Sequence, residues 1–412
     1  MAAATVADAV IVGGGISGIM SAYYLAGAGL KVLLVERGVL AGEASGRNGG
    51  HISPSTYDPA QRELGYLALR LWPELVQEIE LPTEYVQGGA LSIFLAPEVE
   101  AFNERMQRVT TGEEPAELLD AGSLRGMVPY VPDDAAGAVF MPRRGNVNPI
   151  LAAKSFAAAA ESLGATIWEG VAVTGVAVER DAVVGVHTTR GYVATPLLVN
   201  CAGAWASQLG EMVGLTVPVI PHRLQMLITE AVPAFTTATF SGAGIYARQA
   251  RAGQVHFGLL SGPSWDPPLD RFDRAVSLPT LLHTARQMTA LAPGLADVPV
   301  LRSWAGINSI TPDGSPIVDA PVQVRGFIIA AGFWNGFGVG VATGKVVSEL
   351  ALGDRPCIDI SGLALDRFDG YPPDVLYPYA RWRAAPDADA EAAGWPVAGE
   401  RSRIVEVEHA RG

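Results

Sequence analysis

The stretch Val6-Ala-Asp-Ala-Val-Ile-Val-Gly-Gly-Gly-Ile-Ser-Gly18 decides the fold of this chain. It opens with a short apolar run rich in β-branched residues, and a glycine-rich turn follows at once. A helical pattern from Ile19 to Ala28 comes next, and then a second apolar run, Lys31–Glu36. This order predicts a β-α-β unit at the start of the chain, with its strands in a buried parallel sheet.

The glycines of this unit have the spacing Gly13-x-Gly15-x-x-Gly18, and the acidic residue Glu36 ends the second strand. The first glycine permits the tight turn, the second lets the backbone approach a pyrophosphate, and the third allows close packing of helix and strand. The helix N-terminus stabilises phosphate charge, and Glu36 can accept hydrogen bonds from ribose hydroxyls. The pattern predicts a bound adenine dinucleotide. The alternative is a glycine-rich turn in an α/β sheet that holds no nucleotide.

The composition of the 412 residues limits the classes of function. Apolar residues make up 49% and charged residues 17%, so the chain can bury sizeable cores, and its length suits two lobes. The net charge of −13 argues against a nucleic acid or an anionic membrane as the main partner. Cys201 and Cys357 cannot form a disulfide framework, and the N-terminus has no basic segment of a secretory signal. We therefore expect a cytoplasmic protein without an integral membrane segment.

The segment after Glu36 distinguishes between kinds of dinucleotide. A nicotinamide dehydrogenase normally continues as a doubly wound domain, but this chain enters Gly42-Glu-Ala-Ser-Gly-Arg-Asn-Gly-Gly-His51. No second strand–GxGxxG–helix unit follows, which disfavours a two-nucleotide reductase. Gly344-Lys345 lacks the flanking residues of a phosphate-binding P-loop. The spacing of the histidines and cysteines indicates no metal site.

Several motifs, in order along the chain, carry a family resemblance. They are Val10-Ile-Val-Gly-Gly-Gly-Ile-Ser-Gly18 with Glu36-Arg37, Ser45-Gly-Arg-Asn-Gly-Gly50, Leu198-Val-Asn-Cys-Ala-Gly-Ala-Trp205, Trp304-Ala-Gly306, Thr311-Pro-Asp-Gly-Ser-Pro316 and Ala331-Gly-Phe-Trp-Asn-Gly-Phe-Gly338. Together they resemble the D-amino-acid oxidase (DAO) superfamily of FAD-dependent amine and amino-acid oxidoreductases. Glycine oxidase, sarcosine oxidase and the flavin subunits of proline and opine dehydrogenases belong to it. The resemblance runs from about Val6 to Phe368.

The resemblance implies a flavoprotein oxidoreductase with non-covalent FAD. Such an enzyme oxidises the C–N bond of an amine or an N-substituted amino acid by hydride transfer to flavin N5. The imine is then hydrolysed, and the electrons pass to O2, giving H2O2, or to another acceptor. The alternatives are a 2-hydroxy-acid dehydrogenase, the flavin subunit of a multi-subunit amino-acid or opine dehydrogenase that needs partner subunits, and a flavin-binding regulatory protein.

The expected fold is α/β, with a discontinuous FAD-binding Rossmann-like lobe and a second α+β substrate lobe that carries a mixed sheet. The FAD-binding domain is predicted to comprise residues 1–85, 141–215 and 301–365. Residues 86–140 and 216–300 form the predicted substrate domain, and residues 366–412 a C-terminal tail.

The FAD-binding residues follow from the resemblance, motif by motif. The pyrophosphate loop comprises Gly13, Gly15, Ile16, Ser17 and Gly18, and the adenosine end meets Glu36, Arg37 and Val173. A second loop beside the pyrophosphate and the isoalloxazine comprises Ser45, Arg47, Asn48, Gly49 and Gly50. Ala202, Gly203 and Trp205 close over the cofactor. Gly332, Asn335, Gly336, Phe337 and Gly338 would direct a helix N-terminus at the flavin pyrimidine ring, although a glycine-packed buried turn is the alternative for this stretch.

The chain departs from its relatives where they hold a substrate carboxylate. The Arg or Lys of the relatives falls here at Asn308, near Ser53 and at Gly338. A plain α-amino acid is therefore disfavoured, unless one of four other arginines supplies the charge: Arg47, Arg223, Arg248 or Arg302. The alternative for each of these is a phosphate contact or a structural salt bridge. The flavin-linking cysteine of some relatives falls at Gly306, which excludes cysteinyl attachment.

Five residues are candidates for catalysis: His51, Tyr246, Arg248, His256 and Asn335. His51 follows the second flavin loop directly, so a catalytic role or histidyl attachment is conceivable there. His256 would promote the oxygen reaction as a cation or take a proton from the amine, the alternative being a half-buried structural histidine. Tyr246 and Arg248 alternate on the expected partner strand and share a face. Asn335 stands where several relatives have histidine or serine.

Overall fold

A six-stranded sheet contains the N-terminal β-α-β unit. The computed structural model describes residues 5–54, 59–95, 114–260 and 275–371. The strand order is β19 (Ile317–Asp319), β20 (Phe327–Ala331), β13 (Leu198–Asn200), β2 (Ala9–Val12), β3 (Val32–Val35) and β9 (Thr166–Trp168). β19 is antiparallel to β20, and the other pairs are parallel. The predicted buried parallel sheet is therefore present.

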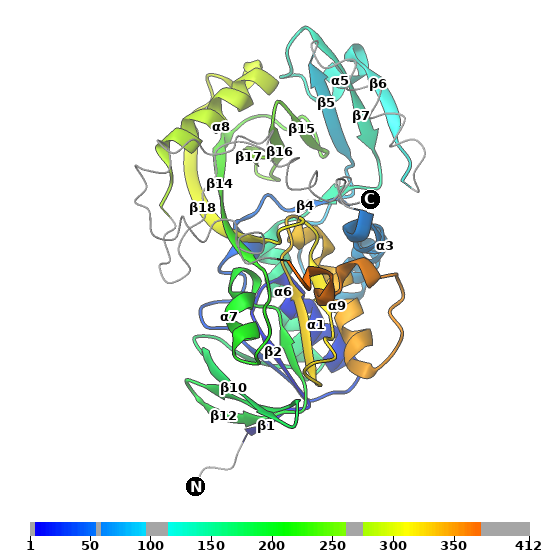
Figure 1. The fold of residues 1–412 in the computed structure, drawn as a ribbon. Coiled ribbons are helices and arrows are strands. Elements are labelled where there is room, and N and C mark those ends of the chain that lie inside the picture. Colours follow the sequence, from blue (N-terminus) through cyan, green and yellow to red (C-terminus); the bar gives the residue numbers. More distant parts are fainter. Residues whose placement is uncertain (1–4, 55–58, 96–113, 261–274, 372–412) are drawn as a thin grey trace.

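Both faces of this sheet are covered because successive side chains of each strand point to opposite sides. In β2, Ile11 packs into one apolar core and Val10 into another. The first core holds the helices α1 (Ile16–Gly27), α3 (Pro59–Ile79), α6 (Pro149–Ser162) and α9 (Gly336–Leu352). The second lies beneath a four-stranded sheet and α7 (Ala206–Glu211). Figure 1 shows α1, α6 and α9 beside β2 in the lower part of the molecule.

The four-stranded sheet extends the same part of the molecule. Its order is β1 (Thr5–Val6), β12 (Gly191–Ala194), β11 (Ala182–Thr188) and β10 (Val173–Glu179). Two short elements lie outside the larger sheets: a two-stranded ribbon of β4 (His51–Ile52) and β8 (Gly145–Asn146), and the helix α2 (Ala44–Arg47). A 3₁₀ turn, η2 (Gly203–Trp205), leads from β13 into α7.

An eight-stranded mixed sheet forms the upper part of the molecule in Figure 1. Its order is β18 (Val300–Ile310), β14 (Ile220–Ala231), β17 (Gln254–Leu259), β16 (Ile245–Gln249), β15 (Thr239–Gly242), β5 (Ala90–Leu95), β7 (Ala135–Met141) and β6 (Glu117–Asp120). Only the β15–β5 pair is parallel among these described strands. The helices α5 (Ala121–Met127) and α8 (Leu278–Leu291), with η3 (Pro293–Leu295), lie along it. The predicted α/β fold with a second lobe around a mixed sheet is confirmed.

One strand of this sheet belongs to a segment that was predicted to lie in the other domain. The sequence places residues 301–310, all of β18 but Val300, in the FAD-binding domain, but β18 pairs with β14 along its length, from Ile310 opposite Ile220 to Val300 opposite Thr229. β14 and β18 reach from the lower part of the molecule to the upper part in Figure 1. The two strands therefore join the parts, and the division into domains stays a prediction.

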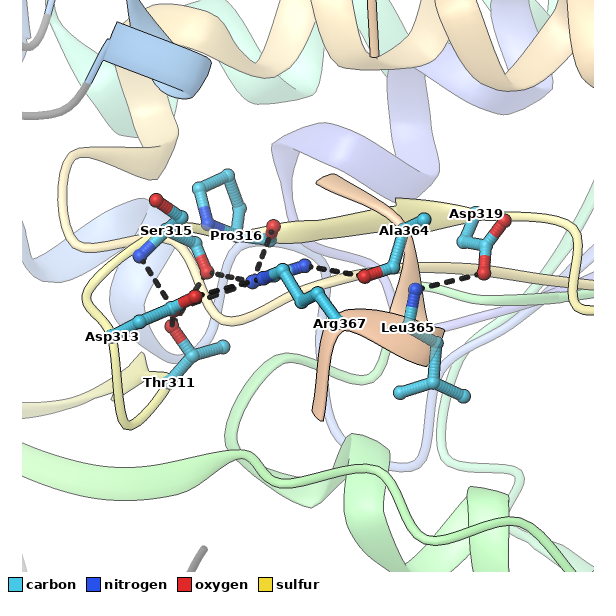
Figure 2. A network of polar contacts seen from close by, with 8 residues as sticks. All are labelled: Thr311, Asp313, Ser315, Pro316, Asp319, Ala364, Leu365 and Arg367. Carbon is cyan, nitrogen blue, oxygen red and sulfur yellow. Dashed lines mark hydrogen bonds and ion pairs between the residues drawn. The ribbon is translucent and has the colours of Figure 1, made fainter. Parts of the chain in front are cut away.

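Hydrogen bonds and an ion pair hold the described C-terminal segment, residues 361–368, against the loop before β19. It contains η4 (Ser361–Leu363) and η5 (Leu365–Phe368). Figure 2 shows Arg367 donating to Asp313 (2.8 Å) and to the carbonyl oxygens of Ser315, Pro316 and Ala364. Residues 372–412 of the predicted tail lie outside the described residues. Within the described part of the chain, no helix is long and apolar enough to cross a membrane.

Candidate active site

The glycine loop lies where the order of the six-stranded sheet reverses. From β2 the chain proceeds to β3 and β9 on one side, and later to β13 and β20 on the other. The loops after β2 and β13 therefore meet, as they do at ligand sites of open α/β sheets. Gly13 has φ +111°, and an added Cβ would lie 2.3 Å from the carbonyl oxygen of Cys201. A Cβ at Gly18 would lie 2.0 Å from the carbonyl oxygen of Gly13.

Glu36 and Ser45 fix the shape of this loop. The Glu36 carboxylate accepts hydrogen bonds from the backbone N–H groups of Gly14 (2.7 Å) and Gly38 (2.6 Å). The Ser45 hydroxyl accepts one from the N–H of Ile16 (2.9 Å), at the start of α1. No side-chain hydrogen bond caps α1 at Gly15. A carboxylate has about four acceptor positions, so Glu36 retains capacity for ribose hydroxyls.

The predicted adenosine and closing residues lie on neighbouring elements. The Arg37 guanidinium stacks over the Trp205 ring, 4.0 Å from its centroid. Gly203, with φ +54°, opens the turn that carries Trp205, directly after Ala202. Val173 starts β10 and packs against the core beneath the four-stranded sheet. The structure thus brings Arg37 and Trp205 together, while Val173 lies in another sheet, and its contact with adenine stays a prediction.

Arg47 holds the second loop against the eight-stranded sheet. Its guanidinium donates to the carbonyl oxygens of Gly42 (2.8 Å) and Ala305 (3.0 Å), the latter in β18. In return, the Trp304 indole N–H donates to the backbone oxygen of Arg47 (2.9 Å). Asn48 holds the loop itself, since its side chain accepts from the N–H of Gly50 (2.7 Å). Arg47 therefore fixes the loop against β18 through backbone contacts.

The third glycine segment forms the N-terminus of α9. Asn335 is its N-cap residue, but the Asn335 side chain donates to the backbone oxygen of Ser53 (2.9 Å) and makes no capping hydrogen bond. Gly332 has φ +82° and Gly336 begins the helix. A Cβ at Gly338 would lie 2.9 Å from the backbone oxygen of His51, so α9 packs against β4. Phe337, next to it, is buried in the core.

These features fit an FAD molecule. Two helix N-termini, after Gly15 and Asn335, have N-cap residues that make no side-chain capping hydrogen bond, so backbone N–H groups beyond the one that Ser45 binds can meet negative charge. At Gly13 and Gly18 the backbone lies too close to neighbouring carbonyl oxygens for a side chain. The buried His51 Nε2 has no hydrogen-bond partner among the described residues, which is typical of a site that takes a ligand. The pyrophosphate, adenosine and flavin residues predicted above would hold the cofactor there.

The face of β16 and β17 that points away from α8 lies against the second loop. Ile245, Ala247 and Val255 point into the core beneath α8. The alternate residues, Tyr246 and Arg248, therefore point to the other side. There, Arg248 Nε donates to the backbone oxygen of Gly49. The rings of Tyr246 and His51 meet edge to face at 4.8 Å.

The strand register brings His256 and Trp304 to the same face. His256 lies opposite Arg248 on the neighbouring strand, and its ring is 6.0 Å from that of Trp304. In the next row, Tyr246 lies opposite Gly258. A Cβ at Gly258 would approach the Tyr246 hydroxyl to 3.1 Å and Met226 Sδ to 2.5 Å. The glycine thereby leaves room for the tyrosine hydroxyl to donate to Met226 Sδ across it (3.0 Å).

Burial determines the charges on this face. It lowers the pKa of His51 to about 3, with further contributions from the positive charge of Arg248 and from His256. Burial and Arg248 lower the pKa of His256 to about 3 as well. Burial lowers the pKa of Arg248 only to about 10 and raises that of Tyr246 to about 12. At neutral pH both histidines and the tyrosine are therefore neutral, and Arg248 carries the positive charge.

Four residues of this face were not among the predicted site residues: Met226, Gly258, Trp304 and Ser53. Trp304 was part of a quoted motif, and its role in holding the loop follows from its distance to Arg47. Met226 and Gly258 gain their roles from the register of three strands, for which the sequence has no local signal. Asn308 donates to the backbone oxygen of Trp334 (2.9 Å) and so supports the segment before α9.

The two cysteines and the possible metal ligands form no further centre in the described part of the chain. Cys201 is buried beneath the glycine loop, and burial raises the pKa of its thiol to about 12. Cys357 is exposed and distant in sequence. No group of three His, Cys, Asp or Glu residues suited to a metal ion occurs among the described residues.

Comparisons with known proteins agree with this geometry. The family model DAO, described as FAD dependent oxidoreductase, matches residues 8–350. The chain is 31% identical over 372 residues to a sarcosine oxidase subunit beta of Rhizobium meliloti, covering 88% of each protein. It is 29% identical over 376 residues to a glycine oxidase of Geobacillus kaustophilus, covering 88% of this chain and 97% of that protein.

Solved structures show the same fold. The glycine oxidase from Geobacillus kaustophilus superposes with a TM-score of 0.81 at 26% identity, covering 88% of this chain and 99% of the other. An L-proline dehydrogenase from P. horikoshii gives a TM-score of 0.81 at 25% identity, covering 89% and 98%. The predicted family and FAD cofactor are thereby confirmed. The matched span and the glycine loops together place the chain in the DAO family, and the protein is an FAD-dependent oxidoreductase.

Proposed function

We propose that this oxidoreductase oxidises the C–N bond of a small amine or an N-substituted amino acid. The similar sarcosine oxidase subunit and glycine oxidases are named for substrates of this kind. The observation that carries the proposal is the face of β16 and β17, where two neutral histidines and one charged arginine lie against the second flavin loop.

The side chains of this face favour the reactive form of an amine. When bound, FAD supplies the acceptor for the hydride that leaves the carbon beside the nitrogen. An amine must be unprotonated to lose that hydride. Burial and the positive charge of Arg248 both disfavour an ammonium ion. The unpartnered His51 Nε2 and His256 Nδ1 offer hydrogen bonds to the neutral amine. The imine product then hydrolyses to a carbonyl compound and an amine.

The site assignments are part of the same proposal. The predicted cofactor residues hold FAD, and His51, Tyr246, Arg248 and His256 contact the substrate. Asn335, whose side chain is bonded to Ser53, positions the start of α9. The division into an FAD-binding domain, a substrate domain and a C-terminal tail is proposed as well. The protein is proposed to act in the cytoplasm on a small molecule, with O2 or a partner subunit as electron acceptor.

Anaerobic flavin reduction tests the proposal. Purified protein saturated with FAD is mixed with simple amines, α-amino acids, N-alkyl amino acids and 2-hydroxy acids. We expect the visible flavin absorbance to bleach with one of the amine classes. Bleaching by 2-hydroxy acids alone would overturn the proposal in favour of that alternative. An absence of bleaching by every compound would overturn it in favour of a partner-dependent or regulatory flavoprotein.

Admission of air then identifies the electron acceptor. Fast return of the flavin absorbance together with peroxide indicates an oxidase. Slow return indicates a dehydrogenase that passes its electrons to another protein or to a soluble carrier.

A further inference from the structure

Trp72 of α3 contacts the first turn of α9 in two ways. Its indole N–H donates to the backbone oxygen of Gly338 (2.7 Å), and its ring stacks on that of Phe337 with 6.1 Å between the centroids. Trp72 is fully buried, so its N–H would be costly without this acceptor. The two contacts therefore fix where the first turn of α9 lies relative to α3.

The neighbouring rings fix the orientation of the Trp72 indole. Tyr85 stacks on it almost in parallel, with 5.9 Å between the centroids and 6° between the planes. The fully buried Phe156 meets it edge to face at 5.5 Å. Because protein interiors are close-packed, another rotamer of Trp72 would collide with these rings. The donor is thus held in place before any ligand binds.

A second side chain holds the segment just before this turn. Asn308, in β18, donates to the backbone oxygen of Trp334 (2.9 Å), one residue before the N-cap residue Asn335. The Asn335 side chain donates to the backbone oxygen of Ser53, which follows β4. The start of α9 is therefore tied to α3, to β18 and to the segment after β4.

None of these hydrogen bonds uses an N–H group of the first turn of α9. Within the described ranges, the N–H groups of residues 336–339 bond to no side chain and to no backbone oxygen outside the helix. The first turn also contains no acidic residue. Aligned N–H groups at a helix N-terminus carry partial positive charge, and the interaction weakens when they are displaced or turned. The side chains that hold the turn thus leave its positive end available.

We propose that Trp72 and Asn308 are positioning residues for the flavin, and that they raise the reduction potential of bound FAD through the backbone of α9. Each holds one carbonyl group, that of Gly338 or that of Trp334, so that the N–H groups between them stay directed at the negative charge that reduction brings. This inference rests on the placement of FAD at the start of α9, which is part of the proposed function. Neither side chain has to touch the flavin.

The reduction potential of the FAD-loaded protein tests the inference. The protein is reduced chemically, without oxygen, beside a reference dye of known potential, so the result does not depend on any substrate. Trp72→Phe keeps an aromatic ring and removes the N–H donor, and Asn308→Leu keeps the approximate shape of the side chain and removes its amide. Phe156→Leu is the matched control, because it also removes volume beside Trp72 but takes part in neither hydrogen bond.

The two donor variants should favour the oxidised flavin. We expect Trp72→Phe and Asn308→Leu each to shift the equilibrium between flavin and dye about three- to tenfold, which is about 15 to 30 mV for a two-electron couple. Phe156→Leu should shift this equilibrium less than about twofold, although urea unfolding should show that it loses stability as Trp72→Phe does. By linkage, reduced FAD should lose more affinity for the donor variants than oxidised FAD does.

Each outcome decides the inference. An unchanged potential in either donor variant that retains FAD overturns it, because the side chain would then serve packing alone. Equal shifts in Trp72→Phe and Phe156→Leu overturn it as well, since lost volume would explain both. Where one donor variant fails to fold or to retain FAD, the potential of the other decides. The expected shifts without flavin reduction by any amine support the inference and overturn only the proposed reaction.

Discussion

The glycine loop after β2 and the face of β16 and β17 are built in opposite ways. Residues 9–36 form the loop, its helix and its acidic partner from one continuous stretch, in which Glu36 returns to bond Gly14. The face collects His51 from β4, Tyr246 and Arg248 from β16, and His256 from β17. Local sequence spacing therefore specifies the first region, whereas strand register specifies the second.

Under the proposed site assignments, this difference separates cofactor binding from substrate choice. The glycine loop tolerates little change, because its contacts are backbone to backbone at Gly13, Gly18 and Cys201. The sheet face is made of side chains on a rigid scaffold, and each can be exchanged while the strand pairing remains. We therefore expect substitutions in the loop to abolish FAD binding and substitutions on the face to change the reaction while FAD stays bound.

The largest effect is expected for Gly18→Ala. The added Cβ would lie 2.0 Å from the carbonyl oxygen of Gly13, so α1 must move away from β2 and the loop must open. We expect FAD affinity to fall on the order of 100-fold or more. The measurement is the FAD content of the purified protein, followed by titration of the apoprotein with FAD. Gly27→Ala, at the other end of α1, is the control, because its Cβ has 3.7 Å to its nearest neighbour. Full FAD content in Gly18→Ala would contradict the steric account of the loop.

A smaller effect is expected for His256→Gln, on the sheet face. The variant keeps a polar side chain opposite Arg248 but loses the neutral imidazole, so FAD should remain bound. We expect the rate of flavin reduction at saturating substrate to fall about 10- to 100-fold. Anaerobic stopped-flow reduction measures this rate. His187→Gln, at an exposed position of β11, should leave the rate unchanged. A rate in His256→Gln equal to that of the wild-type protein would place His256 among structural histidines.

The sequence predicts the glycine loop after β2 better than it predicts the face of β16 and β17. The spacing of Gly13, Gly15 and Gly18 and the position of Glu36 were sufficient to predict the β-α-β unit and the dinucleotide. The family motifs extended this prediction to FAD and to a second lobe with a mixed sheet. For the face of β16 and β17, the alternation along the strand predicted that the side chains of Tyr246 and Arg248 point to the same side of the sheet. The pairing of Gly258 with both Tyr246 and Met226 could not be predicted, because register depends on contacts between strands far apart in sequence.

Burial also had no signal in the sequence. His256 was considered as a cation that promotes the oxygen reaction, yet its surroundings hold it neutral at neutral pH. Arg47 and Arg248 were both offered as possible partners of a substrate carboxylate, and the sequence could not distinguish them in that role. The structure separates them: Arg47 donates to two backbone oxygens, whereas the terminal nitrogens of Arg248 have no partner among the described residues.

Arg367→Ala tests whether the FAD-binding region depends on contacts from the end of the described chain. Arg367 bonds to Asp313 and to three backbone oxygens, those of Ser315 and Pro316 before β19 and that of Ala364 in its own segment, as Figure 2 shows. We expect a loss of about 2 kcal/mol in the free energy of unfolding, because charge-assisted hydrogen bonds are removed. The FAD dissociation constant should change less than about threefold. Urea unfolding and FAD titration measure the two quantities.

The matched control for Arg367→Ala is Arg325→Ala, which removes an exposed hydrogen bond to the backbone oxygen of Arg180. Its loss of stability should be below about 1 kcal/mol. A large drop of FAD affinity in Arg367→Ala would show that the glycine loop is not specified locally, and the comparison drawn above would not hold.

The smallest effect concerns the pH dependence of stability. The pKa values of His51 and His256 are lowered to about 3, from about 6.5 in an unfolded chain. Between these values the unfolded state binds more protons than the folded state, so stability falls as the pH drops below about 6.5. From pH 7 to pH 6 we expect these two histidines to contribute a loss of about 1 kcal/mol in all, because the unfolded imidazoles take up protons over this interval and the folded ones do not. Urea unfolding of the FAD-loaded protein at both pH values measures this loss of stability.

The double variant His51→Gln/His256→Gln should lose less stability over this range than the wild-type protein, and His187→Gln should lose as much as the wild-type protein. Equal losses in the double variant and the wild-type protein would mean that the two imidazoles titrate normally, and that burial on the sheet face leaves their charge unchanged.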